Sequence, residues 1–78
     1  MPTVFRDGPY RVYFFSNEDD EPTHVHVDRD AATARFWVDP LQVARNRGFS
    51  DSELTRIRRM LEERRGELME AWYGWFGI

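Results

Sequence analysis

The chain has 78 residues, with 11 arginines and no lysine against 14 acidic residues, and its net charge of −3 argues against non-specific coating of nucleic acid. A chain of this length has room for one core, so residues 1–78 are expected to form a single domain, and the absence of cysteine excludes disulfides and thiolate metal sites. No apolar run approaches the roughly 20 residues needed to cross a bilayer and no signal-peptide pattern is found, so we expect a cytoplasmic protein without membrane contact.

Four β-strands are predicted over about residues 3–38. Short runs rich in β-branched and aromatic residues, separated by turn signals, fall at residues 3–6, 10–16, 23–29 and 33–38. The connections are short except for the acidic segment 17–22. Short connections favour an antiparallel meander.

Two helices are predicted over about residues 40–76. Asp39-Pro40 has the composition of an N-cap followed by a first helical residue, which predicts a short helix that ends near Gly48. Ser50 and Glu53 have the spacing of a capping box. Apolar residues then follow a helical stripe to the end of the chain: Leu54, Ile57, Leu61, Leu68, Trp72 and Trp75 or Phe76. The predicted fold is a two-layer α+β domain, β-β-β-β-α-α, with the long C-terminal helix covering one face of the four-stranded, mainly antiparallel sheet.

Alternation along the four strands sorts their side chains onto two faces. Neighbouring strands must agree on which face is buried. The core face would collect Phe5, Tyr10, Val12, Phe14, Val25, Val27, Ala34, Phe36 and Val38. The opposite face, called the open face below, would collect Arg6, Arg11, Tyr13, Phe15, His24, His26, Arg35 and Trp37. Exposed aromatics grouped with arginine indicate a binding surface, although cross-strand pairing alone also explains such residues.

The pair His24 and His26 is the feature of the open face most able to carry chemistry. Histidine titrates near neutral pH, so the pair could transfer protons while Arg11 and Arg35 stabilise an anionic transition state, as in the cleavage of RNA. One metal ion could instead bind both imidazoles together with carboxylates from residues 18–21, but no third ligand is set by spacing, and we predict no metal or cofactor. Simple pairing across the sheet is the third alternative.

The predicted partners are RNA or a second protein, bound by Arg6, Tyr13, Phe15 and Trp37 around the histidines. Aromatic rings stack on bases while arginines meet phosphates, and the same residue types anchor protein interfaces. A different alternative places function in the C-terminal half. There the two predicted helices and the turn at Gly48-Phe49 resemble a helix-turn-helix, which would make the chain a DNA-binding or protein-binding regulator without enzymatic activity.

The sequence also resembles an uncharacterised family of small bacterial proteins. Glu21-Pro22-Thr23-His24-Val25-His26-Val27 matches the signature of that family, and Phe36-Trp37, Asp39-Pro40, Ala44-Arg45-Asn46 and Gly48-Phe49-Ser50 continue the match. Thr23 stands where the family pattern has a second proline. The family is a domain of unknown function whose genes often lie in toxin–antitoxin-like pairs. The resemblance therefore implies a component of such a module, with a small partner protein encoded nearby; whether it is a ribonuclease-like toxin and whether it forms a homodimer stay open.

Overall fold

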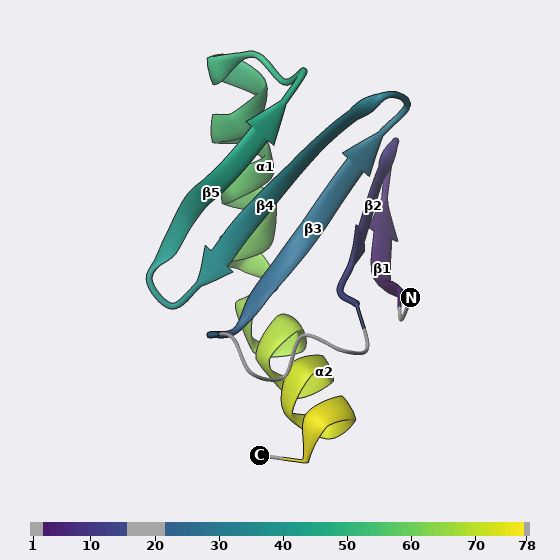
Figure 1. Cartoon of the computed structure of the whole chain (residues 1–78), viewed down its shortest axis with the longest axis vertical. Helices are drawn as coiled ribbons and strands as arrows, with labels where there is room; N and C mark the ends of the chain where they lie inside the picture. The colour runs from purple at the N-terminus through teal and green to yellow at the C-terminus, as the bar shows by residue number, and fades with distance from the viewer. Residues whose placement is uncertain (1–2, 16–21, 78) are drawn as a thin grey trace.

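The computed structural model describes residues 3–15 and 22–77. A five-stranded antiparallel sheet in the order β1-β2-β3-β4-β5 forms one layer, and two helices form the other (Figure 1). The strands are β1 (Thr3–Asp7), β2 (Tyr10–Tyr13), β3 (His24–Arg29), β4 (Ala32–Val38) and β5 (Leu41–Arg47), and the helices are α1 (Asp51–Glu63) and α2 (Arg65–Phe76). No helix of the described residues has the length and apolar character that crossing a membrane requires.

The predicted core face is confirmed. All nine side chains assigned to it are at least 92% buried, and Ile57, Leu61, Leu68 and Trp72 from the helices have almost no exposed surface. Strand register explains the agreement, since Phe5 pairs with Val12, Val12 with Val27, and Val27 with Ala34, which puts them in one row on the same face.

The short helix predicted after Asp39-Pro40 is wrong. These two residues form the turn from β4 into β5, with a cis peptide bond between them, and Leu41–Arg47 pairs with β4 as an edge strand. Gly48 is not a helix C-cap; it has a φ of +100° and connects β5 to α1. The helix-turn-helix expected from this region is therefore absent from the described residues, because its first member is a strand.

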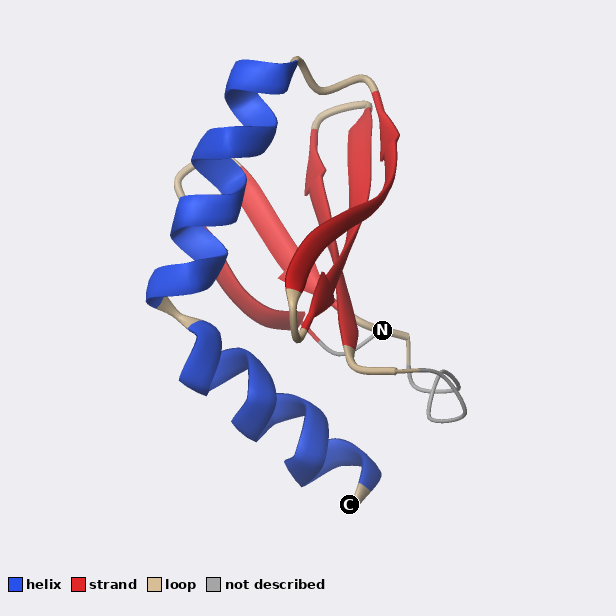
Figure 2. Ribbon diagram, turned by 90° about the vertical axis from the view of Figure 1, so that its left-hand side faces the viewer, coloured by secondary structure: helices blue, strands red, loops and turns tan. Residues whose placement is uncertain are grey.

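The single long helix is only roughly right, because it is interrupted at Arg64. Arg64 has φ −113° and ψ 22°, and its guanidinium lies 4.1 Å from the centre of the Phe5 ring and bridges Asp7 and Glu67. Figure 2 shows the result: α1 lies along one face of the sheet, while α2 continues past the end of the strands. The bend lets the second half of the apolar stripe cover the end of the sheet.

The start of α1 is tied to the sheet by one ion-pair network. Ser50 caps the helix as predicted, with its hydroxyl accepting a hydrogen bond from the backbone N–H of Glu53 at 3.2 Å. The Glu53 carboxylate does not complete the capping box; it accepts hydrogen bonds from the Arg29 guanidinium (2.9 Å to Oε1) and the Tyr10 hydroxyl (2.8 Å). The hydrogen bond from Arg29, then that from Tyr10, lowers the pKa of Glu53.

Candidate functional site

The open face of the sheet is arranged in three cross-strand rows, set by strand register. The first row runs from β2 to β5 through Arg11, Asp28, Thr33 and Arg47; the second runs through Tyr13, His26, Arg35 and Arg45. The third contains His24, Trp37 and Gln42. Six of the eight residues predicted for this face therefore lie in these rows, with Arg6 beside Arg11 on β1 and Phe15 just after β2.

A bulge in β5 brings two further arginines to the open face. Phe36 pairs with Val43 while Arg35 pairs with Arg45, so Ala44 is an extra residue on β5. Before the bulge the odd-numbered Leu41 and Val43 face the core side; after it the odd-numbered Arg45 and Arg47 face the other side. Sequence reasoning missed these arginines because it assigned this segment to a helix.

His24 does not have the exposure predicted for it. Its side chain has no accessible surface, because α2 closes over that end of the sheet and Trp72 packs against the imidazole, with centroids 5.2 Å apart. The Nδ1–H of His24 donates a hydrogen bond to the carbonyl oxygen of Pro22, at 2.9 Å. His26 is half-buried, and its ring centroid is 5.4 Å from that of His24. The two histidines are adjacent, as predicted, but only His26 is accessible from solvent.

Tyr13 is also buried, and it holds other groups in place. Its ring stacks on His26 with centroids 5.3 Å apart, and the Arg11 guanidinium lies 4.4 Å from the ring centre. Its hydroxyl donates to both oxygens of Asp28, at 3.0 and 3.1 Å, and Thr33 donates to the same carboxylate at 2.6 Å. Burial, and then the hydrogen bond to Asp28, raises the pKa of Tyr13 above its ordinary value. The tyrosine therefore stays neutral at physiological pH.

A hollow of about 300 Å³ opens on this face between the aromatic and the cationic side chains. Its lining comprises Tyr13, Phe15 and His26 on one side and Arg35, Arg45 and Arg47 on the other, with Thr33 and Ala34. Phe15 and His26 are half-exposed, and Arg45 and Arg47 are exposed. Trp37 does not line the hollow, but its ring centre lies 4.7 Å from the guanidinium of Arg35, which does.

Positive charge dominates the open face. It carries Arg6, Arg11, Arg35, Arg45 and Arg47, whereas Asp28 is its only carboxylate among the described residues. No group of three or more histidine and acidic side chains that could hold a metal ion forms within residues 3–15 and 22–77. The carboxylates suggested as metal ligands, in residues 18–21, lie outside the described residues.

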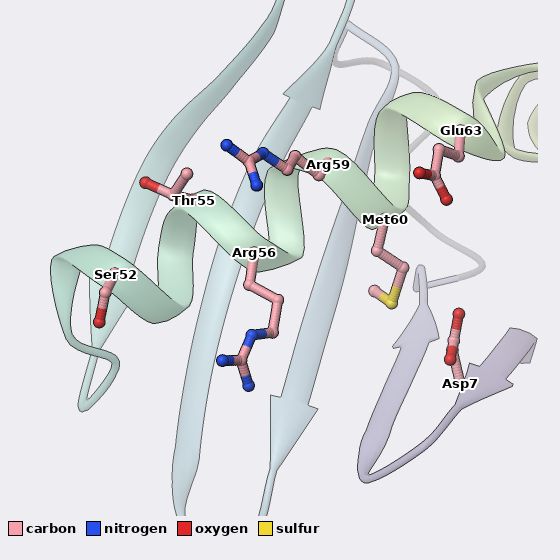
Figure 3. Close-up of a pocket in the computed structure, with 7 residues that line it drawn as sticks. All are labelled: Asp7, Ser52, Thr55, Arg56, Arg59, Met60 and Glu63. Carbon is pink, nitrogen blue, oxygen red and sulfur yellow. The ribbon is translucent and has the colours of Figure 1, made fainter.

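A second hollow, of about 390 Å³, lies between α1 and β1 and has a different character (Figure 3). Its arginines Arg56 and Arg59 come from α1, and the carboxylates of Glu63 and Asp7 line the same space. Because opposite charges balance there, this hollow gives no preference for an anion or a cation. The cationic hollow of the open face is therefore the stronger candidate site.

One of the comparisons with known proteins confirms that the chain contains a domain of unknown function. The family model of a domain of unknown function, DUF4160, matches residues 10–73, from β2 to near the end of α2. Neither the curated proteins nor the solved structures gave a match. The chain belongs to the DUF4160 family.

Proposed function

We propose that this member of the DUF4160 family is a binding protein that takes single-stranded RNA on its open face, as one component of a bacterial toxin–antitoxin-like two-gene module. The observation that carries the proposal is the grouping, among residues 3–15 and 22–77, of five arginines with one carboxylate on one face of a chain whose net charge is −3. Such a segregated positive face attracts a polyanion even when the whole protein is acidic.

The side chains of the open face suit RNA in two ways. Guanidinium groups bind phosphate oxygens bidentately, and half-exposed rings such as Phe15 and His26 contact unpaired bases. Cation–π contacts fix Arg11 over Tyr13 and Arg35 over Trp37, which reduces the conformational entropy that these arginines lose on binding.

Binding without cleavage fits the histidines better than a ribonuclease mechanism. General acid–base cleavage by the pair needs both imidazoles within reach of the substrate. His24 is buried against Trp72 and hydrogen-bonded to Pro22, which supports a structural role, while His26 is accessible and contributes to RNA contact.

The proposal of a two-gene module rests on the resemblance noted in the sequence. The partner would be a small protein encoded by the neighbouring gene. Co-expression of the two proteins followed by size-exclusion chromatography should yield a stable complex, whereas two separate peaks at micromolar concentration would contradict the module. The same run reports whether the chain alone is a homodimer.

RNA binding is tested by fluorescence anisotropy with a labelled unstructured RNA at several salt concentrations. Wild-type affinity should fall as salt rises, with a log–log slope of about −0.7 for each phosphate neutralised. Replacing Arg45 and Arg47 together by glutamine should weaken binding and make the slope shallower by about 1.4.

The matched control replaces Arg58 and Arg59, two exposed arginines of α1, by glutamine. This control changes net charge equally but leaves the open face intact, so its affinity and slope should match those of wild type. Equal losses in the two double variants, or no RNA binding by wild type, would overturn the proposal. If instead the Arg45 and Arg47 double variant loses binding to the partner protein while the control keeps it, the open face would be assigned to protein recognition.

A further inference from the structure

We infer that the hollow of the open face is a subsite for one pyrimidine nucleotide, with the base against Phe15 and His26 and the phosphate against Arg45 and Arg47. The inference rests on the proposed function and narrows it, because it assigns one nucleotide of the bound RNA to one place on the sheet. The remaining arginines would follow the backbone on either side.

The size of the hollow limits its occupant. A volume of about 300 Å³ is at the lower end of the range for ligand pockets, which is about 300–1,000 Å³. That volume suits one small ring with a sugar or phosphate and excludes a helix or duplex. The rest of an RNA strand would have to lie outside it, across the exposed surface of β5.

One side of the hollow is aromatic and the other is cationic, which matches the base and the phosphate of a nucleotide. Aromatic groups come from β3 and from the end of β2: the rings of Phe15 and His26 meet edge to face at 4.8 Å, and Tyr13 stacks behind His26. The cationic groups come from β4 and β5. Strands β3 and β5 are two strand spacings apart, or about 10 Å, so a ligand between them must offer an apolar ring at one end and an anion at the other.

The charges around Arg45 and Arg47 favour an anionic group of the ligand at that end of the hollow. Among the residues that the structure describes, no carboxylate lines the hollow, and neither Arg45 nor Arg47 forms an ion pair. The nearest acid in the rows, Asp28, already accepts hydrogen bonds from Tyr13 and Thr33 on its two oxygens. Guanidinium groups gathered at the mouth of one hollow repel each other, and a phosphate between them removes that repulsion.

The test titrates uniformly ¹⁵N-labelled protein with uridine 5′-monophosphate, uridine or inorganic phosphate and follows amide chemical shifts. Uridine monophosphate should shift the amides of Thr33, Arg45 and Arg47. Its affinity should exceed that of uridine and of phosphate by at least about tenfold each, because it alone engages both sides of the hollow. Phosphate binding as tightly as the nucleotide, or nucleotide shifts centred elsewhere, would overturn the inference.

Variants separate the two ends of the site. Replacing both Arg45 and Arg47 by glutamine should reduce the affinity for uridine monophosphate to that for uridine, and Phe15→Leu should reduce it toward that for phosphate. The Arg58→Gln and Arg59→Gln control should leave it unchanged. Loss of nucleotide affinity in that control, or none in the first two variants, would overturn the inference.

Competition distinguishes this inference from the proposed function. Excess uridine monophosphate should displace labelled RNA from wild type. RNA binding that the nucleotide cannot displace would leave the RNA function standing and overturn the nucleotide subsite. Nucleotide binding in a protein without RNA affinity would overturn the RNA function while supporting a pocket for a free nucleotide.

Discussion

The imidazole of His24, the first residue of β3, packs against the indole of Trp72 from α2, with ring centroids 5.2 Å apart. The same indole is 5.3 Å from the ring of Phe14 and 4.4 Å from that of Phe76. One residue of α2 thus joins the end of the open face to a cluster of aromatic rings. The contact makes α2 part of the core and buries a histidine that alternation places on the open face.

The two tryptophans at the end of α2 are expected to differ sharply in their contribution to stability. Trp72 is 1% exposed and Trp75 is 55% exposed. Trp72→Ala should lower the free energy of unfolding by about 3 to 5 kcal/mol, because it leaves a cavity among the rings. Trp75→Ala should lower it by less than about 1 kcal/mol. Urea denaturation followed by circular dichroism measures both, and equal losses would show that α2 is not packed through Trp72.

Glutamine substitutions of the two histidines should likewise have different effects, on stability for His24 and on RNA binding for His26. His24→Gln should destabilise the fold by about 1 to 3 kcal/mol, because a buried side chain loses its ring contacts and its hydrogen bond to Pro22. His26→Gln should cost less than about 1 kcal/mol and should weaken RNA binding instead. Thermal unfolding and RNA anisotropy of the two variants check this. An unchanged melting temperature for His24→Gln would contradict the buried position.

The free energy of unfolding should decrease at acidic pH, in part because the Glu53 carboxylate becomes protonated. Its pKa in the folded state lies below the ordinary value of 4.5, so its ion pair with Arg29 contributes fully above that pH. The contribution is lost as the pH falls below 4.5 through the folded-state pKa, when the carboxyl group protonates. Wild type should therefore exceed Glu53→Gln in free energy of unfolding at pH 7, and the difference should shrink toward pH 3. A difference independent of pH would exclude the ion pair as its cause.

Two glycine substitutions are expected to have opposite effects. A Cβ on Gly48 would lie 3.2 Å from the Cβ of Ala32, at a φ of +100° that side chains rarely adopt. Gly48→Ala should therefore destabilise the protein by about 1 to 3 kcal/mol. Gly66 is helical and a Cβ there would meet nothing within 4 Å, so Gly66→Ala should stabilise by about 0.5 to 1 kcal/mol. Chemical denaturation of both variants provides the comparison.

Much of the sheet could be predicted from the sequence because β2, β3 and β4 keep a regular alternation and the register of β1 shifts only at its start, between Thr3 and Phe5. In β3 and β4, Val25, Val27, Ala34 and Phe36 fall on every second position, and all are buried. Register then follows, since any slip by one residue would expose the whole set. The helical stripe was equally readable, from Ile57 and Leu61 through to Trp72.

Two features could not be predicted in this way. The alternation in β5 changes phase at Ala44, so the odd-numbered positions pass from apolar to charged and the period of two is lost within seven residues. Periodicity in so short a segment cannot distinguish strand from helix. The burial of His24 depends on the interruption at Arg64, because a straight helix would carry Trp72 past the sheet rather than across its end.

The extra residue in β5 makes the open face tolerant of a change in strand length. Phe36 and Arg35 of β4 pair with Val43 and Arg45, and the exposed Ala44 between those two has no partner residue in β4. Deleting the codon for Ala44 would join Val43 directly to Arg45 and restore a regular alternation, in which Arg45 and Arg47 still lie opposite Arg35 and Thr33 on the open face. Loss of this codon would therefore turn a bulged strand into a regular one and leave its charged surface in place.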